Sequence, residues 1–122
     1  MVYVRGVRGA TTVDADDENA ILSATHDLLQ AIIDANDIRE DDVASIFFTT
    51  TPDLSAAHPA RAARERTGWH SVALMGAKEM VVPGGVARCI RVLIHWNTDK
   101  APQAIRHIYQ NDAVRLRPDR QN

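Results

Sequence analysis

Arginine dominates the cationic side chains that could bind a ligand in this chain. Of the 14 basic residues, 12 are arginine, and arginine suits planar, two-point recognition of carboxylates or phosphates better than lysine does. Arg91 lies in the segment RCIRVLIHWNTD, which predicts a strand with apolar residues on both faces. A guanidinium among buried residues needs an anionic partner, because an unpaired buried charge is costly. That partner is either a carboxylate of the protein or an anionic ligand.

Four arginines, one glutamate and one tyrosine form the candidate binding set. Its members are Arg8, Arg64, Arg91, Arg117, Glu79 and Tyr109. The alternative for each arginine is a structural ion pair, with Glu79 as the salt-bridge partner of Arg91. Tyr109 could equally be a core residue whose hydroxyl reaches the surface. A genome rich in G and C would also raise the arginine content without any ligand.

Covalent and metal chemistry have little support in the sequence. Cys89 lies inside a predicted strand without a glycine-rich turn beside it, and as the single cysteine it cannot form an internal disulfide. The serines lack a recognisable base, and the five histidines show no spacing typical of a metal site. We therefore expect no metal and no cofactor, with His95 and His107 as candidate general bases.

Length and composition predict one globular domain spanning residues 1–122. No apolar run approaches the ~20 residues of a membrane span, and the start MVYVRGVRG lacks the apolar core of a signal peptide, so we expect a cytoplasmic protein. Residues 1–54 carry 3 basic and 11 acidic side chains, whereas residues 55–122 carry 11 and 5. Nucleic-acid binding by the basic half is disfavoured, because aromatic residues make up 5% of the chain and lysine is scarce.

The apolar pattern predicts strands that alternate with helices. Strands are expected over residues 2–13, 43–51, 70–75 and 88–99, with extended pieces after residue 105 and over 113–119. The clearest helix covers residues 18–35, capped by Asp16 or Asp17 and ended by Asn36 in the left-handed conformation. Pro59 begins a shorter helix that Gly68 ends. The result is a mixed α/β domain built on one sheet.

The segments around the candidate binding residues are expected to be irregular. Arg8 is predicted where the first strand gives way to a Gly-Ala turn. Residues 76–85 read as a loop with a turn at Pro83, Gly84 and Gly85, and Glu79 lies within it.

Two helices can hardly cover both faces of a four- or five-stranded sheet. The uncovered face is expected to carry Phe47 or Phe48, Val92 or Leu93, and Trp96. A soluble monomer seldom exposes so much contiguous apolar surface. We therefore expect a homo-oligomer whose sheets pack against one another.

The motifs of the chain occur in an order that is specific to one family. They are RGVRGATTV, TTPDLSAAHPARAARE, TGW, EMVVPGG, CIRVL, NTD and IRHIYQNDAVRLRPD. Together they resemble the monofunctional chorismate mutases of the trimeric AroH class, over nearly the whole chain from Arg5 to Asp119. The resemblance implies an α/β subunit in a homotrimer, with a pseudo-barrel of packed sheets, active sites at the subunit clefts and residues 115–122 as a candidate mobile tail.

The resemblance also implies an activity, the Claisen rearrangement of chorismate to prephenate on the route to phenylalanine and tyrosine. By this resemblance, Arg91 donates a hydrogen bond to the ether oxygen of the bond that breaks and also reaches a substrate carboxylate. Arg8 matches the arginine that binds a carboxylate, and Tyr109 matches the tyrosine that assists it. Glu79 matches the glutamate near the ring hydroxyl and would neutralise Arg91 in the empty site.

The resemblance extends to further positions around the pocket, two of which depart from the family pattern. Met75, Gly76, Ala77 and Lys78 match the loop that lines the pocket, and Arg64 and Arg117 match cations at the cleft mouth that attract a dianion. His58 stands where phenylalanine is common, and Gly76 stands where a cysteine or serine donates a hydrogen bond. We expect Gly76 to weaken binding more than chemistry. The alternative function is a non-catalytic carboxylate-binding trimer on the same fold, which would need Arg8 and Tyr109 but not Arg91.

Overall fold

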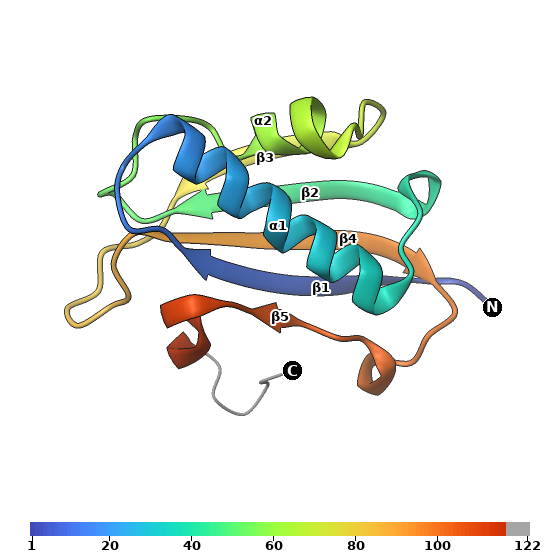
Figure 1. Ribbon diagram of the computed structural model, residues 1–122. Coiled ribbons are helices and arrows are strands. Elements are labelled where there is room, and N and C mark those ends of the chain that lie inside the picture. The colour runs from blue at the N-terminus through green and yellow to red at the C-terminus, as the bar shows by residue number, and fades with distance from the viewer. Residues whose placement is uncertain (117–122) are drawn as a thin grey trace.

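The computed structural model of the protein describes residues 1–116, and Arg117 lies outside that range. One five-stranded mixed sheet has the order β3-β2-β4-β1-β5 (Figure 1). The strands are β1 (Tyr3–Thr12), β2 (Val43–Thr50), β3 (Ala73–Lys78), β4 (Cys89–Thr98) and β5 (Ile108–Tyr109). The helices are α1 (Glu18–Asn36) and α2 (Ala60–Ala62), which continues as a π-helical stretch over Ala63–Thr67. The predicted mixed α/β domain on one sheet is confirmed.

The long central strands pair in antiparallel fashion, and the two edge strands are parallel to their neighbours. β4 pairs antiparallel with both β1 and β2, whereas β3 is parallel to β2 and β5 is parallel to β1. Three short 3-10 helices cover Glu40–Asp42, Pro102–Ala104 and Asn111–Leu116. No helix in residues 1–116 is long and apolar enough to cross a membrane.

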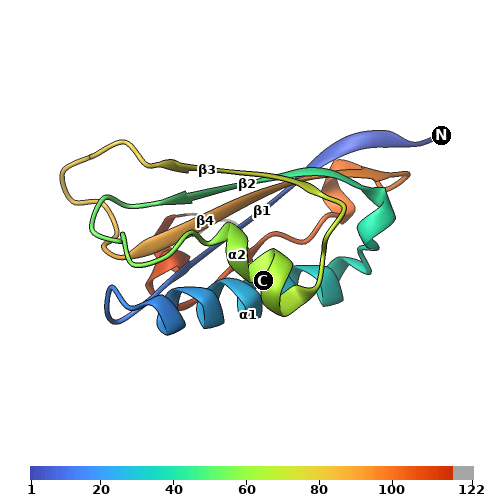
Figure 2. The same ribbon diagram turned by 90° about the horizontal axis from the view of Figure 1, so that it is seen from above.

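Both helices lie against the same face of the sheet, and Figure 2 shows no α-helix against the opposite face, where the 3-10 helix Asn111–Leu116 covers only the end around Ala10 and Cys89. The buried side of β4 alternates through Ile90, Val92, Ile94 and Trp96, as a half-buried strand requires. Trp96 is only 4% exposed, so its predicted place on the uncovered face is wrong. We call the uncovered side the open face; its apolar residues include Phe47, which is 40% exposed.

Helix α1 begins and ends on side chains that the chain supplies locally. Asp17 caps its start by accepting from the Ala20 amide at 2.9 Å. The left-handed position at its end belongs to Asp37, with φ of 58°, so the prediction of Asn36 there was wrong. Asn36 stays helical and is 1% exposed; its buried amide has a different use.

The Asn36 side chain ties the end of α1 to the segment that precedes β5. Its Oδ1 accepts from the Arg106 backbone amide at 2.8 Å, and its Nδ2 donates to the Arg106 carbonyl at 2.9 Å. The same Nδ2 donates to the Ile32 carbonyl at 3.0 Å. A short two-residue strand has few ladder bonds of its own, so this buried amide fixes where β5 runs.

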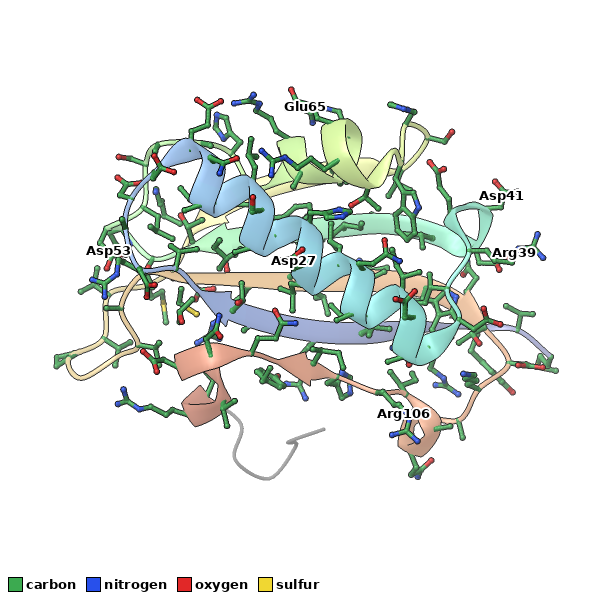
Figure 3. All side chains as sticks on the ribbon, in the orientation of Figure 1. Asp27, Arg39, Asp41, Asp53, Glu65 and Arg106 are labelled. Carbon is green, nitrogen blue, oxygen red and sulfur yellow. The ribbon has the colours of Figure 1, made fainter. Side chains whose placement is uncertain are left out.

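We expect Asn36→Ala to lower the free energy of unfolding by about 2–3 kcal/mol, because it removes the three hydrogen bonds of a buried amide, two of them to the part-buried backbone of Arg106. Urea unfolding at fixed protein concentration measures the change. The matched control is Asp27→Ala, at an exposed site on the same helix (Figure 3), which should stay within about 0.5 kcal/mol of wild type. An equal effect of the two substitutions would contradict the assignment.

Three predicted boundaries near the candidate binding residues were wrong. Arg8 lies in the middle of β1 and not at a turn, because the whole segment Tyr3–Thr12 pairs with β4. β3 continues to Lys78, since residues 76–78 keep their pairing with β2. The predicted extended piece from residue 113 is a 3-10 helix as far as Leu116. The first two boundaries were set by pairing with a neighbouring strand, and the third was set by a local helical turn. Composition reveals neither feature.

Candidate active site

A cleft of about 420 Å³ opens on the open face, and we call it the Arg91 cleft. Residues from four strands line it, together with Glu79 and Leu116. Its wall consists of Arg8, Gly9, Ala10, Phe47, Thr49, Glu79, Arg91, Val92, Leu93, Tyr109 and Leu116. A concave, mostly apolar wall with a few convergent polar groups is typical of a small-molecule site.

Strand register brings the polar groups of the Arg91 cleft together. Arg91 pairs with Ala10 of β1 and with Thr49 of β2, and Ala10 pairs in turn with Tyr109 of β5. Arg8 lies two residues before Ala10, so it projects from the same face of β1. Residues that lie far apart in the sequence thus form one surface.

Arg91 has an ion-pair partner in the protein, but a distant one. Its Nε lies 3.7 Å from Oε2 of Glu79, and the side chains are 46% and 24% exposed. This separation exceeds the 2.7–3.2 Å range of N–H···O hydrogen bonds. The strand neighbours Cys89, Ile90 and Val92 are buried as predicted, but the Arg91 side chain itself is 46% exposed and faces an open cleft in the single chain. The predicted pairing with Glu79 is confirmed.

Arg8 contributes its side chain to the cleft, while its backbone amide is held by His107, the residue before β5. Within residues 1–116 no carboxylate forms an ion pair with its guanidinium. Its backbone amide donates to Nδ1 of His107 at 2.9 Å. Nδ1 of His107 therefore acts as an acceptor for the backbone of β1, and the candidate role of this ring as a general base in the cleft finds no support in its geometry.

The first residues of β4 are tied to the turn that follows β2. Asp53 accepts from the Arg88 amide at 2.9 Å, and Thr51 accepts from the Cys89 amide at 2.9 Å. The Thr51 hydroxyl also donates to Asp53, and these bonds, that of Thr51 foremost, hold the pKa of Asp53 below its usual value. These hydrogen bonds fix the start of β4, and the Arg91 side chain projects from the strand two residues after Cys89.

Neither of the other reactive side chains on β4 is arranged as a nucleophile or base. Cys89 is 1% exposed, and burial raises the pKa of its thiol against the opposing effect of Arg91, so the thiolate is disfavoured. His95 Nδ1 lies 2.9 Å from the Ser45 hydroxyl, and its ring meets Phe47 edge-on. Within residues 1–116, no group of His, Cys, Asp and Glu side chains could hold a metal ion.

Four further candidate residues line a separate hollow of about 500 Å³, which we call the β3 hollow. They are His58, Gly76, Ala77 and Lys78. Lys78 Nζ donates to the Thr50 hydroxyl at 3.1 Å and to the Leu54 carbonyl. Phe48 and Thr50 in this wall alternate along β2 with Phe47 and Thr49 of the Arg91 cleft, so the two hollows lie on opposite faces.

The remaining candidates lie in neither hollow. Met75 pairs with Phe47, so it is on the open face, and it is 61% exposed. Arg64 is exposed in the π-helical stretch after α2. Within the described residues, the predicted site is thus divided between the Arg91 cleft, the β3 hollow and these two outlying positions.

The sequence reasoning missed Phe47 and Thr49 as cleft residues. The available signal was alternation along β2, which places both on the face opposite Phe48. Alternation could not show which face carries the site, because that depends on which residue of β2 pairs with Arg91.

Comparison with known proteins gives consistent matches over most of the chain. A family model described as chorismate mutase type I matches residues 4–120. The chain is 50% identical over 117 residues to a chorismate mutase AroH from Thermus thermophilus, covering 95% of both chains. It is 46% identical over 118 residues to chorismate mutase AroH of Bacillus subtilis, covering 97% of this chain and 93% of the relative. A solved chorismate mutase from Clostridium thermocellum superposes with a TM-score of 0.88 at 48% identity, covering 90% of this chain and 97% of that one.

Proposed function

The chain belongs to the chorismate mutase type I family, and from this premise we propose that it rearranges chorismate to prephenate in the Arg91 cleft. The observation that carries the assignment to this cleft is its charge arrangement. Two arginines and one glutamate lie on one wall, so the cleft favours a dianionic substrate. The reaction belongs to the route to phenylalanine and tyrosine, and we propose that it takes place in the cytoplasm.

The rearrangement is a concerted shift of bonds within one molecule. It asks the protein for no nucleophile, metal or redox cofactor. The enzyme can hold the flexible dianion in its compact reactive conformer, which removes conformational freedom before the reaction. It can also stabilise the charge that separates as the ether C–O bond breaks, negative on the oxygen and positive on the ring.

Each polar residue of the cleft has a role in this scheme. Arg91 donates to the ether oxygen as negative charge grows there, and its planar fork also reaches a side-chain carboxylate of the substrate. Arg8 binds a substrate carboxylate, and the Tyr109 hydroxyl assists it. Glu79 accepts from the ring hydroxyl and offsets the positive charge that develops on the ring.

The active enzyme is a homotrimer in this proposal, with each site completed by a neighbouring subunit. Support comes from the open face, where Phe47 and Met75 leave apolar surface exposed, and from the separation of the β3 hollow from the Arg91 cleft. Residues His58, Gly76 and Lys78 reach a substrate only if an adjacent subunit brings its β3 edge to the cleft. Arg64 then lies near the mouth of the joint site, whereas the matching prediction for Arg117 falls outside the described residues.

A spectrophotometric assay of chorismate loss with purified protein tests the proposal. We expect turnover to prephenate by a species with the mass of a trimer in light scattering. The rival function, a carboxylate-binding trimer without catalysis, predicts that chorismate binds and is not consumed. Turnover by a monomer would support the proposed activity and contradict the proposal that a neighbouring subunit completes the site.

We expect Gly76→Ser and Gly76→Cys to lower KM by about two- to tenfold, because each adds a hydrogen-bond donor for the ring hydroxyl. The nearest atom to an added Cβ is the Phe48 carbonyl oxygen at 3.7 Å, an ordinary contact, so the backbone at Gly76 accepts a Cβ. Steady-state kinetics with chorismate measure the change, with kcat as the internal reference. An unchanged or higher KM in both variants would rule out the missing contact.

A further inference from the structure

Thr49 adjoins both members of the Arg91–Glu79 ion pair in the wall of the Arg91 cleft. It is the cross-strand neighbour of Arg91 on β4, and its hydroxyl donates to Oε2 of Glu79. The side chain is half-buried in the cleft wall. None of the roles described above uses this hydroxyl.

The backbone brings Glu79 to this hydroxyl. The Glu79 amide donates to the Thr50 carbonyl at 2.8 Å, which extends the β2–β3 pairing one residue beyond Lys78. Ala77 pairs with Thr49, and Glu79 follows Ala77 by two residues, so its side chain projects from the open face as well. The hydroxyl and the carboxylate meet as diagonal cross-strand neighbours.

One carboxylate oxygen therefore faces two donors. Oε2 of Glu79 accepts the Thr49 hydroxyl, and it lies 3.7 Å from Nε of Arg91. Arginine and carboxylate groups that meet freely form short, often two-point hydrogen bonds. Here the shared oxygen is engaged by Thr49, and the Arg91 donors stay available to another anion.

We propose that Thr49 is a positioning residue that holds Glu79 apart from Arg91, so that the guanidinium is kept for the substrate. This inference rests on the proposed function of the same cleft. Without the hydroxyl, Glu79 closes onto Arg91, and chorismate has to displace a carboxylate before it binds. The cost of that displacement appears mainly in KM, because it is borne by ground state and transition state alike.

The test compares Thr49→Val, which keeps the shape and removes the hydroxyl, with Thr49→Ser, which keeps the hydroxyl. We expect the valine variant to lose about 10- to 100-fold in kcat/KM, the scale of a hydrogen bond to a charged group, mostly through KM. The serine variant should stay within about threefold of wild type. Thr98→Val, the same substitution at the far end of β4, is the control and should leave kcat/KM unchanged.

A double-mutant cycle with Glu79→Ala separates positioning from general damage. If Thr49 acts through Glu79, the valine substitution has no further effect once Glu79 is absent. Equal losses in both backgrounds, or equal losses for the serine and valine variants, would overturn the inference. Inactivity of the wild-type protein would instead count against the proposed function.

Crystal structures of the wild-type and Thr49→Val proteins give a readout independent of activity. We expect the Glu79–Arg91 distance to fall into the hydrogen-bonding range in the valine variant and to stay longer in wild type. An unchanged distance in the variant would refute the positioning role, whatever the kinetics show.

Discussion

Replacement of Arg91 by alanine should lower kcat by at least about 10²–10³-fold, the usual cost of removing a donor to charge that develops in a transition state. Arg91 combines that donor with a full positive charge. Its place in the structure supports the size of the effect, because it faces the cleft with Glu79 as its sole ion-pair partner within residues 1–116 and at 3.7 Å. Steady-state kinetics with chorismate give the number directly.

Two further variants sharpen the Arg91 prediction. Arg91→Lys should also fail, because a single ammonium cannot reproduce the planar fork of a guanidinium. Arg39→Ala removes an exposed arginine that points outward beyond the start of β2 (Figure 3), and it should leave kcat unchanged. Near wild-type turnover in Arg91→Ala would remove this residue from the mechanism.

The second large effect is expected for Arg8→Ala, as a loss of about 30-fold or more in kcat/KM. Truncation of one partner of a hydrogen-bonded charge pair typically costs 2 kcal/mol or more, and every 1.4 kcal/mol is tenfold. The loss should appear mainly as a higher KM, since the substrate carboxylate is bound before and during the reaction. The melting temperature should change little, because Arg8 has no ion pair within the described residues and its bond to His107 is made by the backbone.

Arg5→Ala is the matched control for Arg8→Ala. Arg5 lies on the opposite face of the same strand, where it contacts the Tyr3 ring and the Lys100 carbonyl. Its loss should leave KM within about twofold of wild type. A similar rise in KM for both variants would show that the effect comes from β1 as a whole and not from the Arg8 side chain.

The sequence predicted the elements that local physics controls. Alternation along β4 separated Val92 and Ile94 from Arg91 and Leu93 correctly, because side chains on a strand alternate whatever its neighbours are. The 3.6-residue repeat located α1, although its left-handed end falls at Asp37. The motifs between Arg5 and Asp119 identified the family, which the matching family model over residues 4–120 confirms.

Local pattern failed where one residue depended on a distant one. Residues 76–78 read as a loop, yet pairing with β2 makes them strand. Trp96 was expected on the open face although alternation already grouped it with the core. Arg8 was predicted at a turn because glycines surround it, whereas pairing with β4 keeps it extended.

The sequence by itself therefore determined which residues could do the chemistry, the face of β4 that Arg91 shares, and the family to which the chain belongs. Only the tertiary structure decided which of these residues meet. It joined Arg8, Glu79, Arg91 and Tyr109 in one cleft, left Gly76 and its neighbours in another hollow, and brought the Thr49 hydroxyl onto the Glu79 carboxylate beside Arg91. The reason is that alternation repeats every two residues within a strand, whereas register is fixed by pairing between strands and by the packing of one buried face.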